Sequence, residues 1–177
     1  MHKDLFLYYV EGACEANFLA SFMHAPMGSH RIRPGKIEIL NPITERISKV
    51  KAMTIKKGTK VILVFDTDIP NVAILNENVK TLRTVAGVSR NDIVFVMSVN
   101  CFEDELVFAC TKLRSVKELV RFFGARGLSD YKSDFSNCKN IVEKLHQAGF
   151  EMNLIWSRSA PAPFDVFPVG SKQIKVK

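Results

Sequence analysis

The chain has few cysteines, and no two of them are spaced as a metal-binding or redox pair. The four cysteines are scattered over 177 residues without a CxxC pattern, which argues against a zinc site and against a disulfide framework. We therefore expect four reduced thiols, mostly in the core.

Long apolar runs, internal repeats and low-complexity linkers are also missing. No stretch reaches the roughly 18 to 20 apolar residues that a membrane-spanning helix requires. Residues 1–4 lead into an apolar strand rather than into a signal-peptide pattern. The hydrophobic content of 47% is enough to bury one core. We expect a single domain over 1–177, located in the cytoplasm and without a membrane partner.

Positive charge is concentrated in one segment. The net charge is +7, and residues 31–60 hold nine basic and two acidic residues, so this segment accounts for all of it. A localised basic band is typical of a surface that binds a polyanion, because neutralised phosphates release counterions. The candidates for nucleic-acid contact are Arg31, Arg33, Lys49, Lys51, Lys56 and Lys57. The alternative is a solvated, lysine-rich helix.

Apolar runs alternate with helical periodicity along the chain. Strands are predicted at 4–10, 36–40, 60–65 and 92–96, and a last short one at 154–156. Helices are predicted at 14–24, 42–54, 70–86, from about 101, at 115–123 and at 137–148, and the tail from 157 is expected to be irregular. This order predicts an α/β fold with an open, mostly parallel sheet of about four strands flanked by helices, and a helical C-terminal part.

The helix predicted at 42–54 follows Asn41 and Pro42, an N-cap residue and a proline at the first helical position. Its apolar positions are Ile43, Ile47, Val50 and Met53, and we expect all four to face the core.

Carboxylates follow three of the predicted strands. Glu11 and Glu15 come after the first, Asp66 and Asp68 after the second, and Glu103 after the third. The carboxyl ends of parallel strands share one edge of a sheet, which is where ligands bind in such folds. Converging carboxylates repel one another unless a hard cation neutralises them. The pattern therefore predicts an Mg²⁺ or Mn²⁺ site with oxygen ligands.

Each of these motifs also has a simpler interpretation. An Asp-x-Asp after a strand is common as a turn or a helix cap, and Glu15 could simply favour the positive end of its helix. Glu103, Asp104 and Glu105 point in different directions on a helix, so at most two of them can reach the cleft. The prediction of a site depends on the motifs occurring together.

Two of the motifs resemble the Toprim domain of topoisomerases, primases and several nucleases. They are Val10-Glu11-Gly12-Ala13-Cys14-Glu15 and Val64-Phe65-Asp66-Thr67-Asp68. The form VEGxxE is most similar to OLD-family and RloB-like Toprim nucleases. Asn100-Cys101-Phe102-Glu103 resembles their Asn-Pro-Cys-Phe-Glu motif without its proline, and Tyr131-Lys132 resembles a lysine-bearing motif of RloB-like proteins. The resemblance covers about residues 4–110, and 111–177 form a C-terminal extension.

The resemblance implies a role for each site residue. Glu11 would perform general acid/base work, Asp66 and Asp68 would hold a divalent ion, and Glu15 and Glu103 would complete a second ion site. Gly12 would let the backbone pass close to a phosphate without a side chain in the way. Lys132 would offset charge on the phosphoryl oxygens, or would be an ordinary surface lysine.

The implied function is a divalent-metal-dependent nuclease that acts on DNA or RNA. RloB-like relatives act in bacterial antiphage defence, often beside an ATPase, so the resemblance implies this context by analogy. This chain has no G-x-x-x-x-G-K-[ST] motif, so an ATPase would be a separate subunit. A homo-oligomer is a further open possibility. The main alternative is a non-catalytic Toprim module that binds nucleic acid or a partner. A phosphatase of the haloacid dehalogenase type is disfavoured, because Pro70 stands where that family expects Thr or Val.

Overall fold

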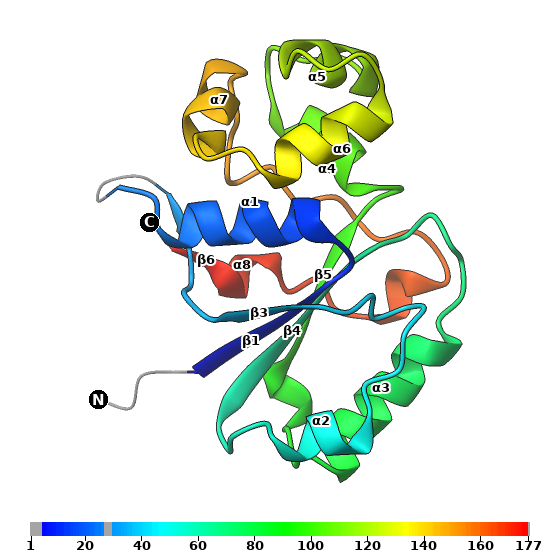
Figure 1. Ribbon diagram of the computed structural model, residues 1–177. Coiled ribbons are helices and arrows are strands. Elements are labelled where there is room, and N and C mark those ends of the chain that lie inside the picture. Colours follow the sequence, from blue (N-terminus) through cyan, green and yellow to red (C-terminus); the bar gives the residue numbers. More distant parts are fainter. Residues whose placement is uncertain (1–4, 27–29, 177) are drawn as a thin grey trace.

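The computed structural model describes residues 5–26 and 30–176, and its centre is a four-stranded parallel sheet in the order β3-β1-β4-β5 (Figure 1). The strands are β1 (Leu5–Val10), β3 (Lys36–Ile39), β4 (Thr59–Asp66) and β5 (Ile93–Ser98). Helices flank this sheet and the C-terminal part is helical, as the sequence predicts. Within the described ranges, no helix is both long and apolar enough to cross a membrane.

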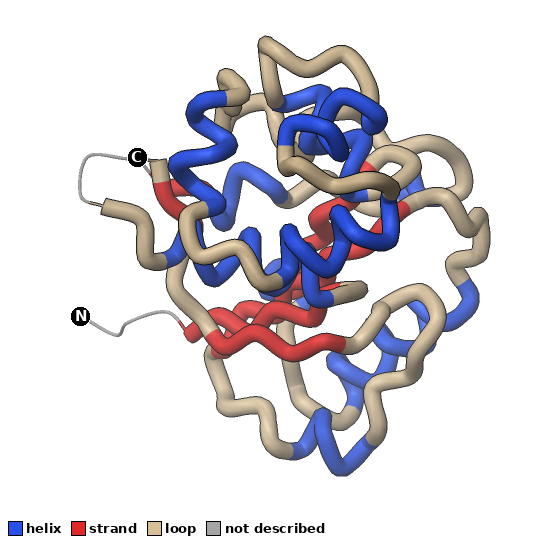
Figure 2. The backbone as a smooth tube through the Cα atoms, turned by 45° about the horizontal axis from the view of Figure 1, so that its top comes forward, coloured by secondary structure: helices blue, strands red, loops and turns tan. Residues whose placement is uncertain are grey.

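The sheet is buried on both faces because its inner strands are almost wholly apolar. On one face, α1 (Ala13–Met23) buries Phe18, Leu19 and Phe22, whereas α3 (Ala73–Thr84) covers the other face with Leu75 and Leu82. The strands therefore pass between two layers of helices (Figure 2). The 3₁₀ helix η1 (Arg90–Asp92) leads from α3 into β5.

Four helices stack on the α1 side of the sheet (Figure 1). They are α4 (Phe102–Ala109), α5 (Val116–Phe122), α6 (Leu128–Ser136) and α7 (Ile141–Gln147), and α1 packs against α6 and α7. An aromatic cluster of Phe123, Tyr131 and Phe135, with ring centroids 5.2–5.4 Å apart, fixes α6 beneath α5. We refer to residues 111–148 as the helical cap.

The C-terminal segment returns to the sheet. It contains η2 (Phe164–Val166), α8 (Ser171–Ile174) and β6 (Lys175–Val176), and β6 pairs antiparallel with β2 (Arg31–Ile32). Gly170 donates its N–H to the Phe95 carbonyl at 2.8 Å, and a Cβ at Gly170 would collide with Val94. This part of the tail is therefore ordered along β5, and the prediction of an irregular tail is wrong for it.

The prediction of a helix at 42–54 is wrong for the first half of that range. Only α2 (Lys49–Met53) is helical, and it begins at the N-cap Ser48. Before it, the buried Asn78 side chain accepts from the Ile47 N–H at 2.7 Å and donates to the Pro42 and Glu45 carbonyls. These bonds replace those of a helix. Ile43 and Ile47 are buried as predicted, but Val50 and Met53 are exposed.

Two other predicted elements, both in the C-terminal part, differ from the structure. The predicted helix 137–148 is confirmed only as the shorter α7, and α6 was not predicted. The strand predicted at 154–156 is a turn in which Trp156 has a positive φ of 55°. The Trp156 N–H donates to the buried Glu105 carboxylate at 2.9 Å, which a strand pairing would not allow.

Candidate metal centre

Glu11 and Asp66 meet where two neighbouring strands end. Val10 of β1 lies opposite Val64 of β4 in the sheet, so the residues that follow are brought side by side. The Asp66 backbone N–H donates to Glu11 Oε2 at 3.1 Å. The two motifs that follow the first and second predicted strands are thus joined in one place.

Asp66 is a buried carboxylate with one unpaired oxygen. Only 7% of the residue is exposed, and its Oδ1 atom has no hydrogen-bond partner. Burial raises the pKa of Asp66 to about 8, and the Glu11 and Glu15 carboxylates add to the rise, although the Ser98 hydroxyl and the Phe102 amide oppose it. An unpaired buried carboxylate oxygen is costly, and this atom is free to bind a cation.

Glu15 lies in the first turn of α1 and is also buried. Burial raises its pKa to about 7; a hydrogen bond to its own backbone amide opposes this, and Glu11 and Glu103 add to it. Gly12 is the N-cap of α1, and a Cβ there would lie 3.3 Å from Glu15 Oε2. Glu15 therefore does both things considered for it: it places a carboxylate in the first turn of its helix, and it faces the other carboxylates.

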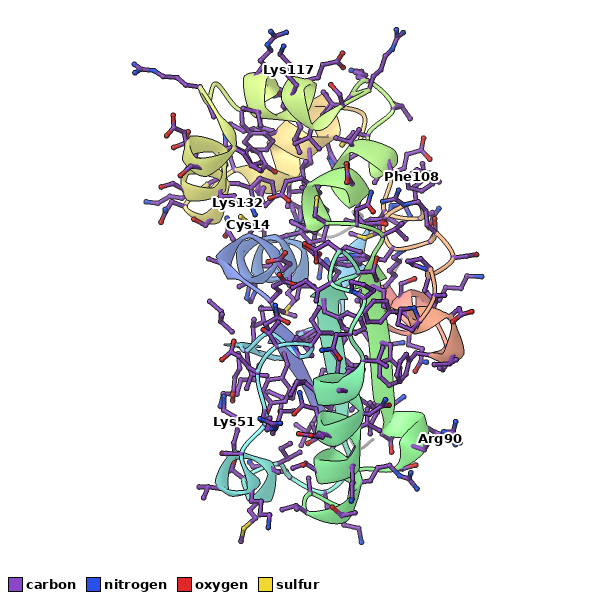
Figure 3. All side chains as sticks on the ribbon, turned by 90° about the vertical axis from the view of Figure 1, so that its right-hand side faces the viewer. Cys14, Lys51, Arg90, Phe108, Lys117 and Lys132 are labelled. Atoms are coloured by element: carbon purple, nitrogen blue, oxygen red, sulfur yellow. The ribbon has the colours of Figure 1, made fainter. Side chains whose placement is uncertain are left out.

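Glu103 reaches the same group from α4, and Lys132 lies over it. The Lys132 Nζ is 3.5 Å from Glu103 Oε1. Although partial burial lowers the pKa of Lys132, the Glu103 carboxylate leaves it above its ordinary value. Lys132 and Cys14 come from different helices but lie together (Figure 3).

The position of Lys132 depends on how α6 docks on α1. The Asn17 side chain of α1 donates to the Phe135 and Cys138 carbonyls at 2.8 and 3.0 Å, at the end of α6. The Cys14 thiol donates to the Lys132 carbonyl at 3.5 Å. These contacts hold α6 against the first turns of α1, beside the carboxylates.

The three acidic residues after β5 have three different environments. Glu103 faces the other carboxylates, whereas Asp104 accepts from the Asn100 side chain at 3.3 Å. Glu105 is fully buried and forms an ion pair with Arg158 at 2.7 Å, in addition to its bond from Trp156. Glu105 therefore anchors the C-terminal segment, and only one of the three acids joins the site.

Asp68 differs from Asp66 in its exposure. The chain bends at Thr67, whose N–H donates to the Ser98 and Asn100 carbonyls at 3.0 Å, and the Asp68 side chain is exposed. Its carboxylate nevertheless lies close enough to Glu11 to raise the pKa of Glu11. Across residues 5–26 and 30–176, no three acidic, histidine or cysteine side chains already stand close enough to hold a metal ion. The donor set nevertheless fits Mg²⁺, because it offers only oxygen atoms and one of them is buried and unpaired.

The basic residues of 31–60 do not form one face with the carboxylates. Lys56 and Lys57 precede β4, and the eight residues of that strand separate them from Asp66 by roughly 25 Å. Lys51 pairs with Glu38 at 2.8 Å and lies far from Lys132 (Figure 3). Lys49 is exposed at the start of α2.

The two arginines of this segment bond to backbone carbonyls. Arg31 donates to the carbonyl of Pro26 at 3.4 Å, and Arg33 donates to that of Gln173 at 3.0 Å. Arg33 also lies over the Phe6 ring, with its guanidinium carbon 5.7 Å from the centroid. Both arginine side chains are therefore already bonded to the backbone of neighbouring segments.

Sequence reasoning assigned no role to Ser98 or to Arg158. Ser98 is the last residue of β5, is fully buried, and accepts from the Trp156 indole N–H at 3.3 Å. Its place at a strand end beside Asp66 is a signal that could have identified it. The pairing of Arg158 with Glu105 carries no such signal, because 53 residues separate them.

No protein-family model matches the chain, and neither a curated protein nor a solved structure matches it.

Proposed function

We propose that this chain is a divalent-metal-dependent nuclease of the Toprim type. The observation that carries the proposal is the unpaired Asp66 Oδ1 atom, which belongs to a buried carboxylate beside Glu11 and Glu15. Folding gains nothing from collecting carboxylates whose pKa values rise through burial and mutual repulsion. Such an arrangement is typical of sites whose function requires a cation.

The ion would be held by Asp66, Glu11 and Glu15, with Glu103 as a further ligand and Asp68 within reach by a movement of the bend after β4. A bound Mg²⁺ or Mn²⁺ would polarise the phosphoryl group and lower the pKa of an attacking water.

The protein's own groups would do the remaining work. Glu11 has a pKa raised mainly by burial, and a general base works best when its pKa approaches the working pH. It would accept the proton of the attacking water. Gly12 exposes backbone at the N-terminus of α1, where a phosphate can approach. Lys132, with 56% of its side chain exposed beside Glu103, would offset negative charge on the phosphoryl oxygens.

The proposed substrate is DNA or RNA, and the proposed setting is the cytoplasm, in antiphage defence with a separate ATPase subunit. The test is cleavage of labelled single- and double-stranded DNA and RNA by the purified chain, with Mg²⁺, with Mn²⁺ and with a chelator. An aryl phosphate monoester serves as the control substrate. Metal-dependent cleavage of a polynucleotide without release of phosphate from the monoester supports the proposal, and no cleavage under any condition contradicts it.

The second candidate is a non-catalytic Toprim module. Such a module would bind nucleic acid or a partner equally well with and without the ion. Calorimetric titration with Mn²⁺ separates the two candidates, because only the nuclease requires saturable binding that Asp66→Asn removes.

A further inference from the structure

A basic surface lies where α5 turns into α6. We call residues 121–128 the α5–α6 corner. Arg121, Phe122, Arg126 and Leu128 are exposed there, and the nearest acidic residues along the chain, Glu118 and Asp130, lie just outside the corner. The corner belongs to the helical cap, which sits above α1 and α4 (Figure 1).

The charges of the corner are free to act on a ligand. No carboxylate within 5–26 and 30–176 lies within 4.0 Å of the Arg121 or Arg126 guanidinium. In the 31–60 segment, Lys36 and Lys51 share Glu38, and Arg46 is bound to Glu77. Among the described residues, Lys49, Lys56 and Lys57 likewise have no carboxylate within 4.0 Å, but they lie at the other end of the sheet. A guanidinium without a partner is well suited to bind phosphate, which it can contact through two parallel N–H groups.

An aromatic ring lies between these charges in the sequence. Phe122 is 37% exposed, although its neighbour Phe123 is buried and holds it edge-on, with ring centroids 5.7 Å apart. Leu128 adds a second exposed apolar side chain. Exposed aromatics beside arginines are typical of surfaces that bind single strands, on which bases stack without sequence preference.

The corner is also close to the carboxylates. Helix α6 begins at Leu128 and carries Lys132, which contacts Glu103. At 1.5 Å per residue, Lys132 is about 6 Å further along the helix axis than Leu128, which is a distance of the order of one nucleotide. A strand that crosses the corner would thus reach the carboxylates within a few nucleotides.

We propose that the α5–α6 corner binds a single-stranded segment of nucleic acid and directs it to the carboxylates. Arg121 and Arg126 contact phosphates, and Phe122 stacks on a base. This inference takes its substrate class from the proposed nuclease function, but binding at the corner requires neither an ion nor catalysis. It moves the nucleic-acid contact from the 31–60 segment to the helical cap.

The test compares two pairs of charges at opposite ends of the molecule. Fluorescence anisotropy with labelled single-stranded DNA and RNA, in a chelator, measures the Kd of wild type, Arg121→Gln/Arg126→Gln and Lys56→Gln/Lys57→Gln. We expect at least tenfold weaker binding for the arginine pair and little change for the lysine pair. Loss of two phosphate contacts should also lower the slope of log K against log salt by about 1.4.

A second pair of variants tests the stacking. Phe122→Ala should weaken single-strand binding roughly 5- to 150-fold, from a stacking energy of about 1 to 3 kcal/mol per base. Phe108→Ala is the matched control, because Phe108 is similarly exposed, at 42%, but belongs to α4 and lies beside Arg158, whose guanidinium carbon is 5.0 Å from the ring centroid. Circular dichroism establishes that each variant is folded.

Three results would overturn the inference: no binding by folded wild type, weaker binding only in the lysine pair, or an unchanged Kd in the arginine pair. Preference for a duplex with no effect of Phe122→Ala would overturn the single-strand assignment. If the arginine pair weakens binding but wild type never cleaves, the inference stands and the nuclease proposal fails.

Discussion

The Asp66 backbone N–H donates to the Glu11 carboxylate, and the side chain of Asp66 is left with an unpaired oxygen. The backbone of Asp66 therefore binds the Glu11 side chain, while the side chain of Asp66 adds a second carboxylate beside it. This hydrogen bond keeps the Glu11 and Asp66 carboxylates close together although their charges repel.

Asp66→Asn should stabilise the metal-free protein at high pH. The pKa of Asp66 is raised to about 8 in the folded state, mainly by burial, but is about 3.9 in an unfolded chain. Between these values the folded state holds a proton that the unfolded chain has released, so the free energy of unfolding falls as pH rises from about 4 to 8. In a chelator, urea unfolding should show the variant roughly 5 kcal/mol more stable than wild type at pH 9, because about four pKa units correspond to about 1.4 kcal/mol each, with little difference at pH 4.

Asp68→Asn is the control, because the Asp68 side chain is exposed and its loss should change stability little at either pH. If wild type and Asp66→Asn show the same dependence of unfolding free energy on pH, ionisation of Asp66 does not destabilise the fold as we expect.

Mg²⁺ or Mn²⁺ should stabilise the wild type more at pH 8 than at pH 6. Ligands must lose their protons to bind an ion, and the pKa values of Glu15 and Asp66 are raised to about 7 and about 8, with burial as the main cause. An ion at a hundredfold excess over its Kd stabilises a fold by about 2.7 kcal/mol. Thermal unfolding with and without the ion measures the gain. A gain of the same size in Asp66→Asn would place the ion elsewhere.

Glu105→Ala should unfold the C-terminal segment rather than affect catalysis directly. It would leave Arg158 without its carboxylate and the buried Trp156 N–H without an acceptor. Removing one partner of a buried pair typically costs about 3 to 5 kcal/mol, and partial exposure of Arg158 places this case near the lower figure. Asp104→Ala, next to it on α4, should cost much less. A stable but inactive Glu105→Ala protein would show that Glu105, not Glu103, serves the site.

Lys132→Met should lower the rate of cleavage by roughly a hundredfold with little change in thermal stability. The side chain is more than half exposed, so its loss leaves no buried group unpaired except for weaker support of Glu103. Lys139→Met, an exposed lysine just beyond α6, is the control for a general loss of positive charge. Equal rates for wild type and Lys132→Met would make Lys132 an ordinary surface residue.

The strands and the strand-end acids could be predicted because both follow from local pattern. The apolar runs before Glu11 and Asp66 are long enough to be buried strands, and parallel strands bring their carboxyl ends together. The position of Glu15 could be predicted because a helix was expected to begin directly after the first strand. These residues are near one another in the fold for reasons that are visible in short segments.

Other features depend on contacts between distant segments. The helix predicted at 42–54 failed because Asn78, more than 30 residues away, takes its hydrogen bonds. The choice among Glu103, Asp104 and Glu105 is made by Arg158 and Trp156. The position of Lys132 depends on Asn17 holding α6, a helix whose short polar sequence gave little periodic signal. In each case the residue that determines the local structure lies in a distant segment, so the local sequence gives no sign of it.

The cleavage rate of Glu11→Gln tests whether the carboxylate that follows β1 acts as the general base. The substitution keeps the shape of the side chain and removes its capacity to accept a proton. Glu143→Gln, an exposed glutamate on α7, is the matched control. With Mg²⁺ or Mn²⁺ and a labelled single strand, we predict cleavage by wild type and by Glu143→Gln, and a rate lowered at least a hundredfold in Glu11→Gln. Equal cleavage by wild type and Glu11→Gln would contradict the account.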